Sequence, residues 1–187
     1  MRTGRCEISE MGAFAAAEMN LDGSGAATVS TGSGFMDHMI SSMAKLGSID
    51  ISASAGGNSL YRYSLLGAVI GASLDHALGE RSGIRRYGFA AIPMDDALAE
   101  VALDLGGRAY LVMRGSFHGE RIGDLNTFEI KAVLKGITDR GRLTLHVRFE
   151  GENDHHIAES IFKALGLAIR NAVEPGSPGV LSTKGVI

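Results

Sequence analysis

Hydrophobic and polar positions follow two different periods along this 187-residue chain. Residues 35–46 and the stretch after residue 154 carry apolar side chains at intervals of three and four, which is the spacing of one helix face. We predict another helix over residues 59–78. Residues 13–21, 26–30 and 49–55 read as strands. The pattern therefore predicts the order strand, strand, helix, strand, helix.

Turn-forming residues and caps separate these elements. The sequence Asp22-Gly23-Ser24-Gly25 has the chemistry of a tight turn and predicts that the first two strands form a hairpin. Gly47 ends the first helix, and Gly56-Gly57-Asn58 turns the chain into the second. Asn153 or Asp154 is a good N-cap for the last helix. The apolar face of that helix consists of Ile157, Ile161, Ala164, Leu165, Ala168 and Ala172.

The same order of elements occurs twice, and the letters repeat with it. Residues 18–27 align without gaps with residues 100–109 at an offset of 82. Residues 58–74 align with residues 153–169 at an offset of 95, and Gly47 falls opposite Gly141. A longer hairpin that includes residues 115–124 enlarges the second copy. We therefore predict an α/β (α+β, two-layer) chain of two β-β-α-β-α half-domains, residues 1–88 and 89–187, with residues 81–88 as the connector.

Composition and charge exclude several classes of protein. A hydrophobic content of 45% is enough for a core, and the single cysteine, Cys6, excludes an internal disulfide. The longest apolar run, residues 65–74, is too short to cross a membrane, and no apolar signal core follows the first residues. We therefore expect a cytoplasmic location and no membrane role. A net charge of -3 argues against a general nucleic-acid binder, although Arg81, Arg85 and Arg86 could hold a small anion.

The start of the last predicted helix carries the clearest chemistry. His155 and Glu159 lie four residues apart and His156 and Glu159 three apart, so each pair can meet on the helix surface. The two histidines point roughly 100° apart around the axis, so we expect them to serve two sites. Imidazole with carboxylate suits Mn, Fe, Zn or Ni, and it also suits proton transfer. A polar helix start with two solvated histidines is the alternative that this motif alone leaves open.

Four segments together resemble a known family. They are Ser30-Thr31-Gly32-Ser33-Gly34-Phe35-Met36-Asp37-His38-Met39, Asp104-Leu105-Gly106-Gly107-Arg108, residues 153–164 and Ser182-Thr183-Lys184-Gly185, and residues 83–88 and 94–98 fit as well. Their order and spacing are similar to imidazoleglycerol-phosphate dehydratase, a lyase of histidine biosynthesis. The resemblance implies that each half-domain is a four-stranded sheet backed by helices. It also implies a homo-oligomer, either a 24-mer or another assembly built from trimers.

The resemblance implies a reaction and a set of site residues. The family dehydrates imidazole glycerol phosphate to imidazole acetol phosphate, and its Mn ions, bound by residues of both halves and of neighbouring subunits, hold the substrate imidazole as an imidazolate. The positions that match family metal ligands are His38, His155, His156 and Glu159. Of these, His38, His156 and Glu159 are the candidate catalytic residues. The positions that match the family's phosphate grip are Arg86, Arg108, Lys163, Ser182 and Lys184.

The match is uneven on the metal side. At half of the expected ligand positions the side chain is apolar or binds metals poorly. These positions hold Leu60, Tyr61, Ser64 and Ala132. Tyr61 is the one replacement that could bind a metal. The family's N-terminal glutamate, which contacts substrate, falls on Gly12, and Glu10 is the nearest substitute.

These departures leave several hypotheses open. The first is a hydro-lyase that works with at most one Mn, Fe or Zn ion per site and is impaired. The second is a non-catalytic oligomeric paralogue that holds no metal and binds a phosphorylated small molecule. A third is metal-free acid–base chemistry with His38 and His156, for which the sequence gives no substrate. In each case the partner is a small molecule, and neither a nucleic acid nor a membrane.

Overall fold

The computed structural model describes residues 1–182. The helices and strands, in chain order, are β1 (Thr3–Glu10), β2 (Ala13–Asn20), β3 (Ala27–Ser30), α1 (Gly34–Gly47), β4 (Asp50–Gly57), α2 (Ser59–Leu78), β5 (Tyr87–Met94), β6 (Ala97–Asp104), β7 (Tyr110–Arg114), β8 (Arg121–Ile122), β9 (Leu125–Asn126), α3 (Thr127–Gly141), β10 (Thr144–Glu150) and α4 (Asp154–Val173). The predicted first two helices appear as α1 and α2, with ends within one residue of those expected. Their apolar periods and caps are local signals, which is why the sequence locates them well.

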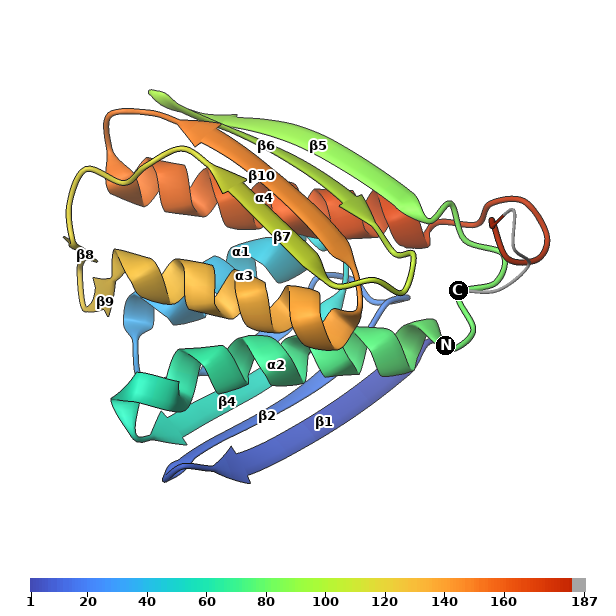
Figure 1. The fold of residues 1–187 in the computed structure, drawn as a ribbon, viewed down its shortest axis with the longest axis horizontal. Coiled ribbons are helices and arrows are strands. Elements are labelled where there is room, and N and C mark those ends of the chain that lie inside the picture. Colours follow the sequence, from blue (N-terminus) through green and yellow to red (C-terminus); the bar gives the residue numbers. More distant parts are fainter. Residues whose placement is uncertain (183–187) are drawn as a thin grey trace.

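Two four-stranded sheets enclose the helices, one on each side (Figure 1). The strand orders are β1-β2-β4-β3 and β5-β6-β10-β7. In both sheets the first three strands are antiparallel and the last is parallel to its neighbour. The central strands β2 and β6 show the same alternation of buried and exposed residues along their full length, because one face of each sheet packs on helices. The predicted fold class, two four-stranded sheets backed by helices, is confirmed.

The helices of the two halves pack against each other in equivalent pairs, α1 with α4 and α2 with α3. Glycines allow this close approach of the backbones. A Cβ atom on Gly166 would lie 2.1 Å from the carbonyl oxygen of Met43, and one on Gly71 would lie 2.5 Å from that of Ile137. Because Gly71 and Gly166 are 95 residues apart and Met43 and Ile137 are 94 apart, one contact occurs twice. The predicted offsets of 94 and 95 are confirmed at these helices.

The predicted hairpin of residues 13–21 and 26–30 is wrong. β2 pairs with β1, and β3 lies on the far side of β4 as its parallel neighbour. The Asp50 carboxylate accepts hydrogen bonds from the backbone amides of Ser24, Gly25 and Ala26, at 2.8, 3.1 and 3.0 Å. These bonds hold the turn against the start of β4. The chain then continues as β3 on the far side of β4. In the second half, β10 separates β6 from β7 in the same way: β6 pairs with β5 and β10, and the short β8–β9 hairpin follows β7.

The predicted element order and one repeat offset also need correction. Each half begins with a strand that the prediction lacked, and in the first half this strand is β1. Its inward residues are Gly4, Cys6 and Ile8, which are too weakly apolar to signal a strand. The strands β1 and β2 match β5 and β6 at an offset of 84 rather than 82, because Thr3 pairs with Asn20 where Tyr87 pairs with Asp104.

The proposed division into residues 1–88 and 89–187 falls two residues inside β5, which follows α2 after a connector of residues 79–86. Arginines in this connector bond to the rest of the fold. Arg81 is buried and forms an ion pair with Asp75, and Arg85 pairs with Glu174 at 2.9 Å. The suggested anion cluster is therefore occupied by carboxylates of the chain itself. Within residues 1–182, no helix combines the length and the apolar character needed to cross a bilayer.

Candidate metal site

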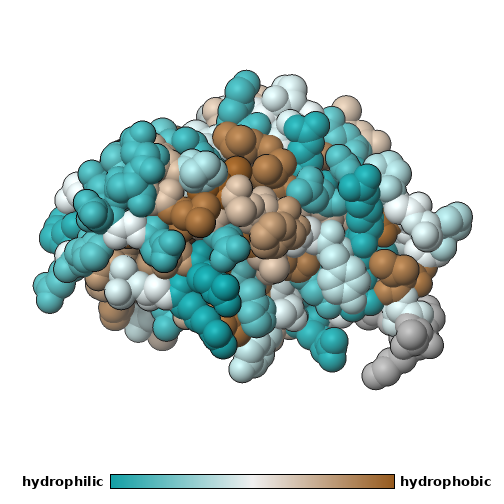
Figure 2. Space-filling model, turned by 90° about the horizontal axis from the view of Figure 1, so that it is seen from above, coloured by the Kyte–Doolittle hydropathy of each residue, from teal (hydrophilic) through white to brown (hydrophobic). Residues whose placement is uncertain are grey.

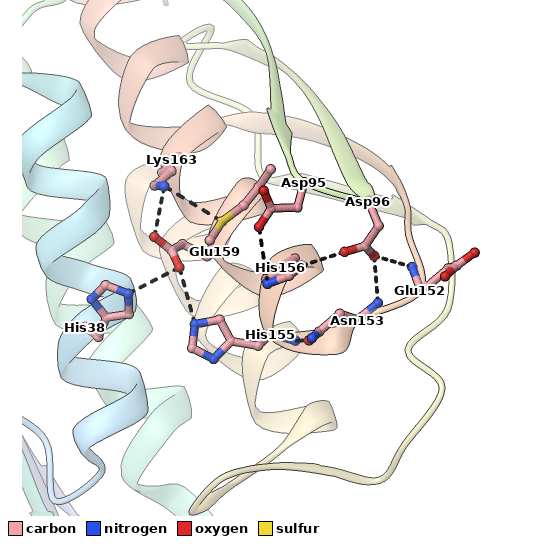
Figure 3. A network of polar contacts seen from close by, with 10 residues as sticks. His38, Asp95, Asp96, Glu152, Asn153, His155, His156, Glu159 and Lys163 are labelled. Atoms are coloured by element: carbon pink, nitrogen blue, oxygen red, sulfur yellow. Dashed lines mark hydrogen bonds and ion pairs between the residues drawn. The ribbon is translucent and has the colours of Figure 1, made fainter.

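The first turns of α1 and α4 bring three potential metal ligands together. Side-chain caps fix both helix starts: the Ser33 hydroxyl accepts a hydrogen bond from the amide of Met36 at 3.1 Å, and the Asn153 side chain accepts one from the amide of His155 at 2.9 Å. Because the two helices pack side by side, His38 of α1 faces His155 and Glu159 of α4 (Figure 3).

The geometry of these three side chains is compact. The Nε2 atoms of His38 and His155 each lie 3.3 Å from Oε2 of Glu159. The three ligand atoms lie within 4.8 Å of one another, and in the described part of the chain this is the only such group of three His, Cys, Asp or Glu side chains. The Glu159 side chain is 9% exposed, whereas those of His38 and His155 are 49% and 46% exposed. The carboxylate is therefore the floor of the site, and the imidazoles form its open rim.

Lys163 holds the second oxygen of the same carboxylate. Its Nζ atom lies 2.9 Å from Oε1 of Glu159, one helical turn further along α4, and 3.8 Å from the sulfur of Met94. Burial raises the pKa of Glu159, but the hydrogen bonds from Lys163 and His38 outweigh it, so that the pKa lies below its usual value. Glu159 is therefore ionised at neutral pH, and its Oε2 atom faces the two imidazoles.

His156 points to a different set of partners, as expected from the angle between adjacent helical residues. Its Nδ1 atom lies 2.5 Å from Oδ1 of Asp96, and its Nε2 atom lies 3.6 Å from Oδ2 of Asp95 (Figure 3). The other oxygen of Asp96 accepts hydrogen bonds from the amides of Glu152 and Asn153, at 2.6 and 2.7 Å. Asp96 therefore fixes both the imidazole and the turn that starts α4.

Asp96 is strongly stabilised as an anion. The hydrogen bond with His156 is the largest cause, and together with the bonds from Asn153 and Glu152 it holds the pKa of this carboxyl well below its usual value. Imidazole, two carboxylates and the nearby three-ligand group thus lie on one patch at the start of α4. This arrangement suits a divalent cation together with a separately oriented proton-transfer group.

Comparisons with known proteins identify the family of this chain. The sequence model of the family described as imidazoleglycerol-phosphate dehydratase matches residues 31–169. The chain is 44% identical over 174 residues to imidazoleglycerol-phosphate dehydratase of Methanococcoides burtonii, covering 91% of each chain. It is 39% identical over 193 residues to that of Clostridium botulinum, covering 100% of this chain and 95% of the other.

The chain belongs to the imidazoleglycerol-phosphate dehydratase family. Solved structures agree in fold. Imidazoleglycerol-phosphate dehydratase of Staphylococcus aureus superposes with a TM-score of 0.84 at 27% identity, over 93% of this chain and 99% of that one. The Pyrococcus furiosus structure, in complex with (S)-C348, gives a TM-score of 0.85 at 27% identity, over 97% and 100%. The resemblance seen in the sequence is thereby confirmed.

The donor set in this member of the dehydratase family fits a divalent metal ion. The carboxylate oxygen lies 3.3 Å from each imidazole nitrogen, a separation that two ligands of one divalent ion can adopt. Two imidazoles and one carboxylate are ligands that Mn, Fe and Zn accept. The half-exposed rim leaves further coordination positions open. His38, His155 and Glu159 would therefore hold one ion, and His156, which is bonded to Asp96, stands outside this group.

The positions at which the resemblance implies a second ligand set lie at the equivalent helix starts of α2 and α3, and their side chains, Leu60, Tyr61, Ser64 and Ala132, are apolar or poor metal ligands. Leu60 is 71% exposed, and the Ser64 hydroxyl donates to the carbonyl of Tyr61 at 2.8 Å. Ser64 and Ala132 line a shallow groove with Glu10, and the same groove holds the ion pair of Lys135 with Asp139. Glu10 therefore lies near Ser64 and Ala132, and its role as a substitute for the glutamate expected at Gly12 stays a prediction.

Among the described residues, the predicted phosphate-binding residues fall into two groups, Lys163 near the start of α4 and the others toward its end. Arg86 is committed to Asp104, with its Nε and Nη2 atoms 2.6 and 3.0 Å from the two carboxylate oxygens, and it also donates to the carbonyl of Leu181. This bond to Asp104 raises the pKa of Arg86 further. Arg108 is exposed, Ser182 follows the Leu181 carbonyl, and Lys184 lies outside the described residues.

Lys163 lies far from this group and close to the candidate metal site. The backbone of Arg86 bonds to the carbonyl of Ala172, near the end of α4, whereas His155 is in the first turn. Seventeen residues of helix separate the two ends by about 25 Å. A site that uses both groups would have to combine residues of different subunits, in line with the expectation from the family.

Several participants were not assigned from the sequence. The sequence places Asp95, Asp96 and Phe35 only within family-like segments and gives them no role, whereas the Phe35 ring lies 5.2 Å from the His155 ring in an edge-to-face contact. Two adjacent carboxylates at the turn between two strands were the available signal. Their pairing with His156 depends on a contact across sixty residues, which no local pattern reveals.

Proposed function

We propose that this chain is a metal-dependent hydro-lyase that dehydrates imidazole glycerol phosphate, or a close phosphate ester, to the corresponding acetol phosphate. The observation that carries the proposal is the group of His38, His155 and Glu159, whose ligand atoms lie within 4.8 Å of one another in a member of a dehydratase family. We further propose Mn, Fe or Zn as the metal, one ion per site, in a cytoplasmic homo-oligomer.

The residues of the chain divide the work between binding and proton transfer. His38, His155 and Glu159 would hold the ion, which when bound supplies the positive charge that favours an anionic imidazole ring in the substrate. Lys163 keeps Glu159 ionised and binds its Oε1 atom. His156 is held at Nδ1 by Asp96, so its Nε2 atom is the group that takes or gives a proton on the open side of the site.

The phosphate contacts are the less complete part of the proposal. Arg108 is exposed and available, and Ser182 lies next to the Arg86 contact at the other end of α4. Because about 25 Å separates this end from the candidate metal site, the two groups would serve one substrate only when contributed by different subunits. This arrangement supports activity in an oligomer and none in an isolated chain.

A second candidate function rests on the replaced ligands. Leu60 and Ala132 bring apolar groups to positions where the family has metal ligands, and these would disfavour a charged ion. A non-catalytic oligomeric paralogue that binds a phosphorylated small molecule would show this pattern. In the hydro-lyase, the same replacements reduce the number of ions and lower the activity.

The test is direct measurement of product with the purified chain. The protein is loaded with Mn, Fe or Zn in turn and incubated with imidazole glycerol phosphate, and a Glu159→Gln variant serves as the metal-deficient control. The hydro-lyase proposal predicts product in at least one metal-loaded sample and little in the control. It also predicts that the chain restores growth of a histidine auxotroph lacking the dehydratase. Binding of the substrate without product in any sample would instead support the paralogue.

A further inference from the structure

The connection between β7 and α3 is longer than its counterpart in the first half. Residues 31–33 join β3 to α1, whereas residues 115–126, here called the insert, join β7 to α3. The sheets and helix pairs of the two halves are equivalent, so the extra residues are not needed to complete the repeat. In Figure 1 the insert runs around the end of the molecule at which α3 and α4 begin. This end also carries the candidate metal site.

One part of the insert is bonded to the first residue of α4. The Asp154 carboxylate accepts hydrogen bonds from the amide of His118, at 2.9 and 3.1 Å to its two oxygens, and from the amide of Gly119 at 2.7 Å. The Nε2 atom of the His118 ring lies 2.8 Å from the carbonyl oxygen of Gly151, in the loop before α4. Because Asp154 immediately precedes His155, these bonds attach the insert to the ligand-bearing turn of α4.

Another part of the insert is bonded to the start of α1. The Asp124 carboxylate accepts hydrogen bonds from the hydroxyl of Ser33 at 2.7 Å and from the amide of Gly34 at 3.0 Å. The bond from Ser33 holds the pKa of Asp124 below its usual value, so this carboxylate is charged at neutral pH. Charged acceptors form the stronger hydrogen bonds, and a negative charge suits the N-terminus of a helix. The insert therefore joins the first turns of the two helices that carry the candidate ligands.

The close backbone contact between α1 and α4 lies away from these ligands. Along the helix axes, the contact that Gly166 makes with α1 is about 8 Å from His38 and about 10 Å from Glu159. A small rotation of α1 about this contact would change the 3.3 Å separation of His38 and Glu159. Contacts at the helix starts oppose such a rotation. They are the ring contact of Phe35 with His155 and the hydrogen bonds of the insert.

We propose that the insert sets the spacing between the starts of α1 and α4, and that Asp124 and Asp154 are positioning residues for the metal ligands His38, His155 and Glu159. Neither carboxylate is itself a ligand in the three-residue group. Each helix start keeps its own cap without the insert, but the separation of the two starts then varies more. The inference rests on the candidate metal site of the proposed function and adds the residues that hold its geometry.

The packing of the insert allows its carboxylate contacts to be removed without unfolding it. Its inward residues Ile122 and Leu125 are 7% and 0% exposed, and the Phe117 ring lies 5.2 Å from that of Phe149. Figure 2 shows mostly hydrophilic side chains at the end of the molecule where the insert lies, on the left in both figures. The apolar anchors remain when a carboxylate is replaced, so we expect the variants to fold.

The first test is the affinity for Mn, measured by calorimetric titration of the full chain. Asp124→Ala and Asp154→Ala should each lower it about 10-fold, as the loss of an outer partner of a metal site does. A connection broken at either end is lost as a whole, so the double variant should lose little more than either single variant. Asp124→Asn keeps an oxygen for the Ser33 hydroxyl and should recover most of the affinity. Losses that add in the double variant would show two independent helix caps and overturn the proposal.

Asp50→Ala is the matched control. The Asp50 carboxylate also accepts hydrogen bonds from backbone amides, but it follows the end of α1, whereas His38 lies near the start. Its replacement should lower the stability in urea and leave the Mn affinity unchanged. An equal loss of affinity for Asp50→Ala, or no loss for Asp124→Ala, would overturn the proposal.

Hydrogen exchange on the metal-free chain separates this inference from the proposed function. In Asp124→Ala the amide of Gly34 should exchange about 5-fold faster, the factor expected for loss of a helix cap. Asp154→Ala should also speed exchange at Gly34, although Asp154 bonds only to the insert there, and the amide of Ile49 beyond the end of α1 should not change. A wild type that binds no Mn would contradict the proposed function. Unchanged exchange at Gly34 in Asp154→Ala would contradict the role of the insert, with or without metal binding, and faster exchange would support it.

Discussion

Asn58 and Asn153 begin α2 and α4 in the same way, since each side chain accepts a hydrogen bond from the amide two residues further on. The strand turns that precede them are also alike, with Met11 and Asp95 both in the left-handed region at φ values of 53° and 48°. The chemistry that follows differs. In the second half Asp96 binds the N-cap amide through its side chain, whereas in the first half the carbonyl of Gly12 does so.

The comparison separates what the fold needs from what the site needs. Caps, strand registers and the glycine contacts between helices occur in both halves, so they maintain the fold. The candidate metal ligands occur in one of two equivalent sets: His38 of the first half joins His155 and Glu159 of the second, and the equivalent backbone positions hold Ala132, Leu60 and Ser64. The backbone of this fold therefore forms in the same way with and without potential ligands at these positions.

The largest effect is expected at the carboxylate shared by both imidazoles. Glu159→Gln removes the negative charge that faces His38 and His155, and we expect the affinity for Mn or Zn to fall about 100-fold or more, beyond the effect of losing an outer partner. Calorimetric titration measures this change. Ser64→Ala, at the equivalent position of the first half, should leave the affinity unchanged. If Glu159→Gln kept the wild-type affinity, the two equivalent sets of positions would not differ in metal binding as the account requires.

Restoring ligands at the replaced positions extends the same comparison. The variant Leu60→His, Tyr61→His, Ser64→Glu and Ala132→His places ligands on a backbone equivalent to that of the candidate metal site. We expect it to bind one additional equivalent of metal, more weakly than the native site because the flanking Gly12 supplies no counterpart of Asp96. Metal analysis after saturation and desalting gives the stoichiometry. No gain over the wild type would mean that the two helix starts are less alike than their caps suggest.

The paired glycines test whether the two halves share their packing. Alanine at Gly166 or Gly71 brings a methyl group against a backbone carbonyl, at 2.1 and 2.5 Å, and should destabilise the fold by about 1–3 kcal/mol, more for Gly166. Urea denaturation measures the free energy of unfolding. Gly34→Ala is the control, because no atom lies within 4 Å of the added methyl group. Stability equal to that of the control for either glycine variant would contradict the equivalence.

The smallest expected effect concerns Asp96, which has no carboxylate counterpart in the first half. Because the pKa of this carboxyl is lowered in the folded chain, its contribution to stability is fully present above its ordinary value of 3.8 and is lost as the pH falls through the folded-state pKa. Wild type should therefore exceed Asp96→Asn in stability at pH 5 to 7, and the difference should shrink below pH 4. Thermal melts across this range measure it. A difference that grows on acidification would show that the sign is wrong.

The sequence predicts the helices well and the strand pairing poorly, for a physical reason. Helix period and caps lie within a few neighbouring residues, so α1 and α2 appear where expected. Strand partners depend on contacts between residues far apart in the sequence. The residues Asp22–Gly25 alone predict a hairpin, but the amides that follow the turn bind Asp50 at the start of β4. The repeated residues in the sequence indicate the duplication. The offset of the first two strands of each half follows only from the strand registers.

In the candidate site, too, local contacts can be predicted from the sequence and long-range contacts cannot. The spacing of His155 and Glu159 predicts their contact, and the family resemblance adds His38 from a helix more than a hundred residues away. The partners of His156 and Arg86 came only from the structure, because Asp96 and Asp104 reach them through tertiary contacts. Arg86, expected to grip phosphate, is held by a carboxylate of its own chain.

The central claim is that His38, His155 and Glu159 bind a metal ion and that the equivalent positions, Ala132, Leu60 and Ser64, do not. The number of Mn ions per chain, measured by elemental analysis after saturation and removal of free metal, tests it most directly. The account predicts about one ion per chain in the wild type and none in Glu159→Gln. Two ions per chain, or one ion that survives the loss of Glu159, would contradict it.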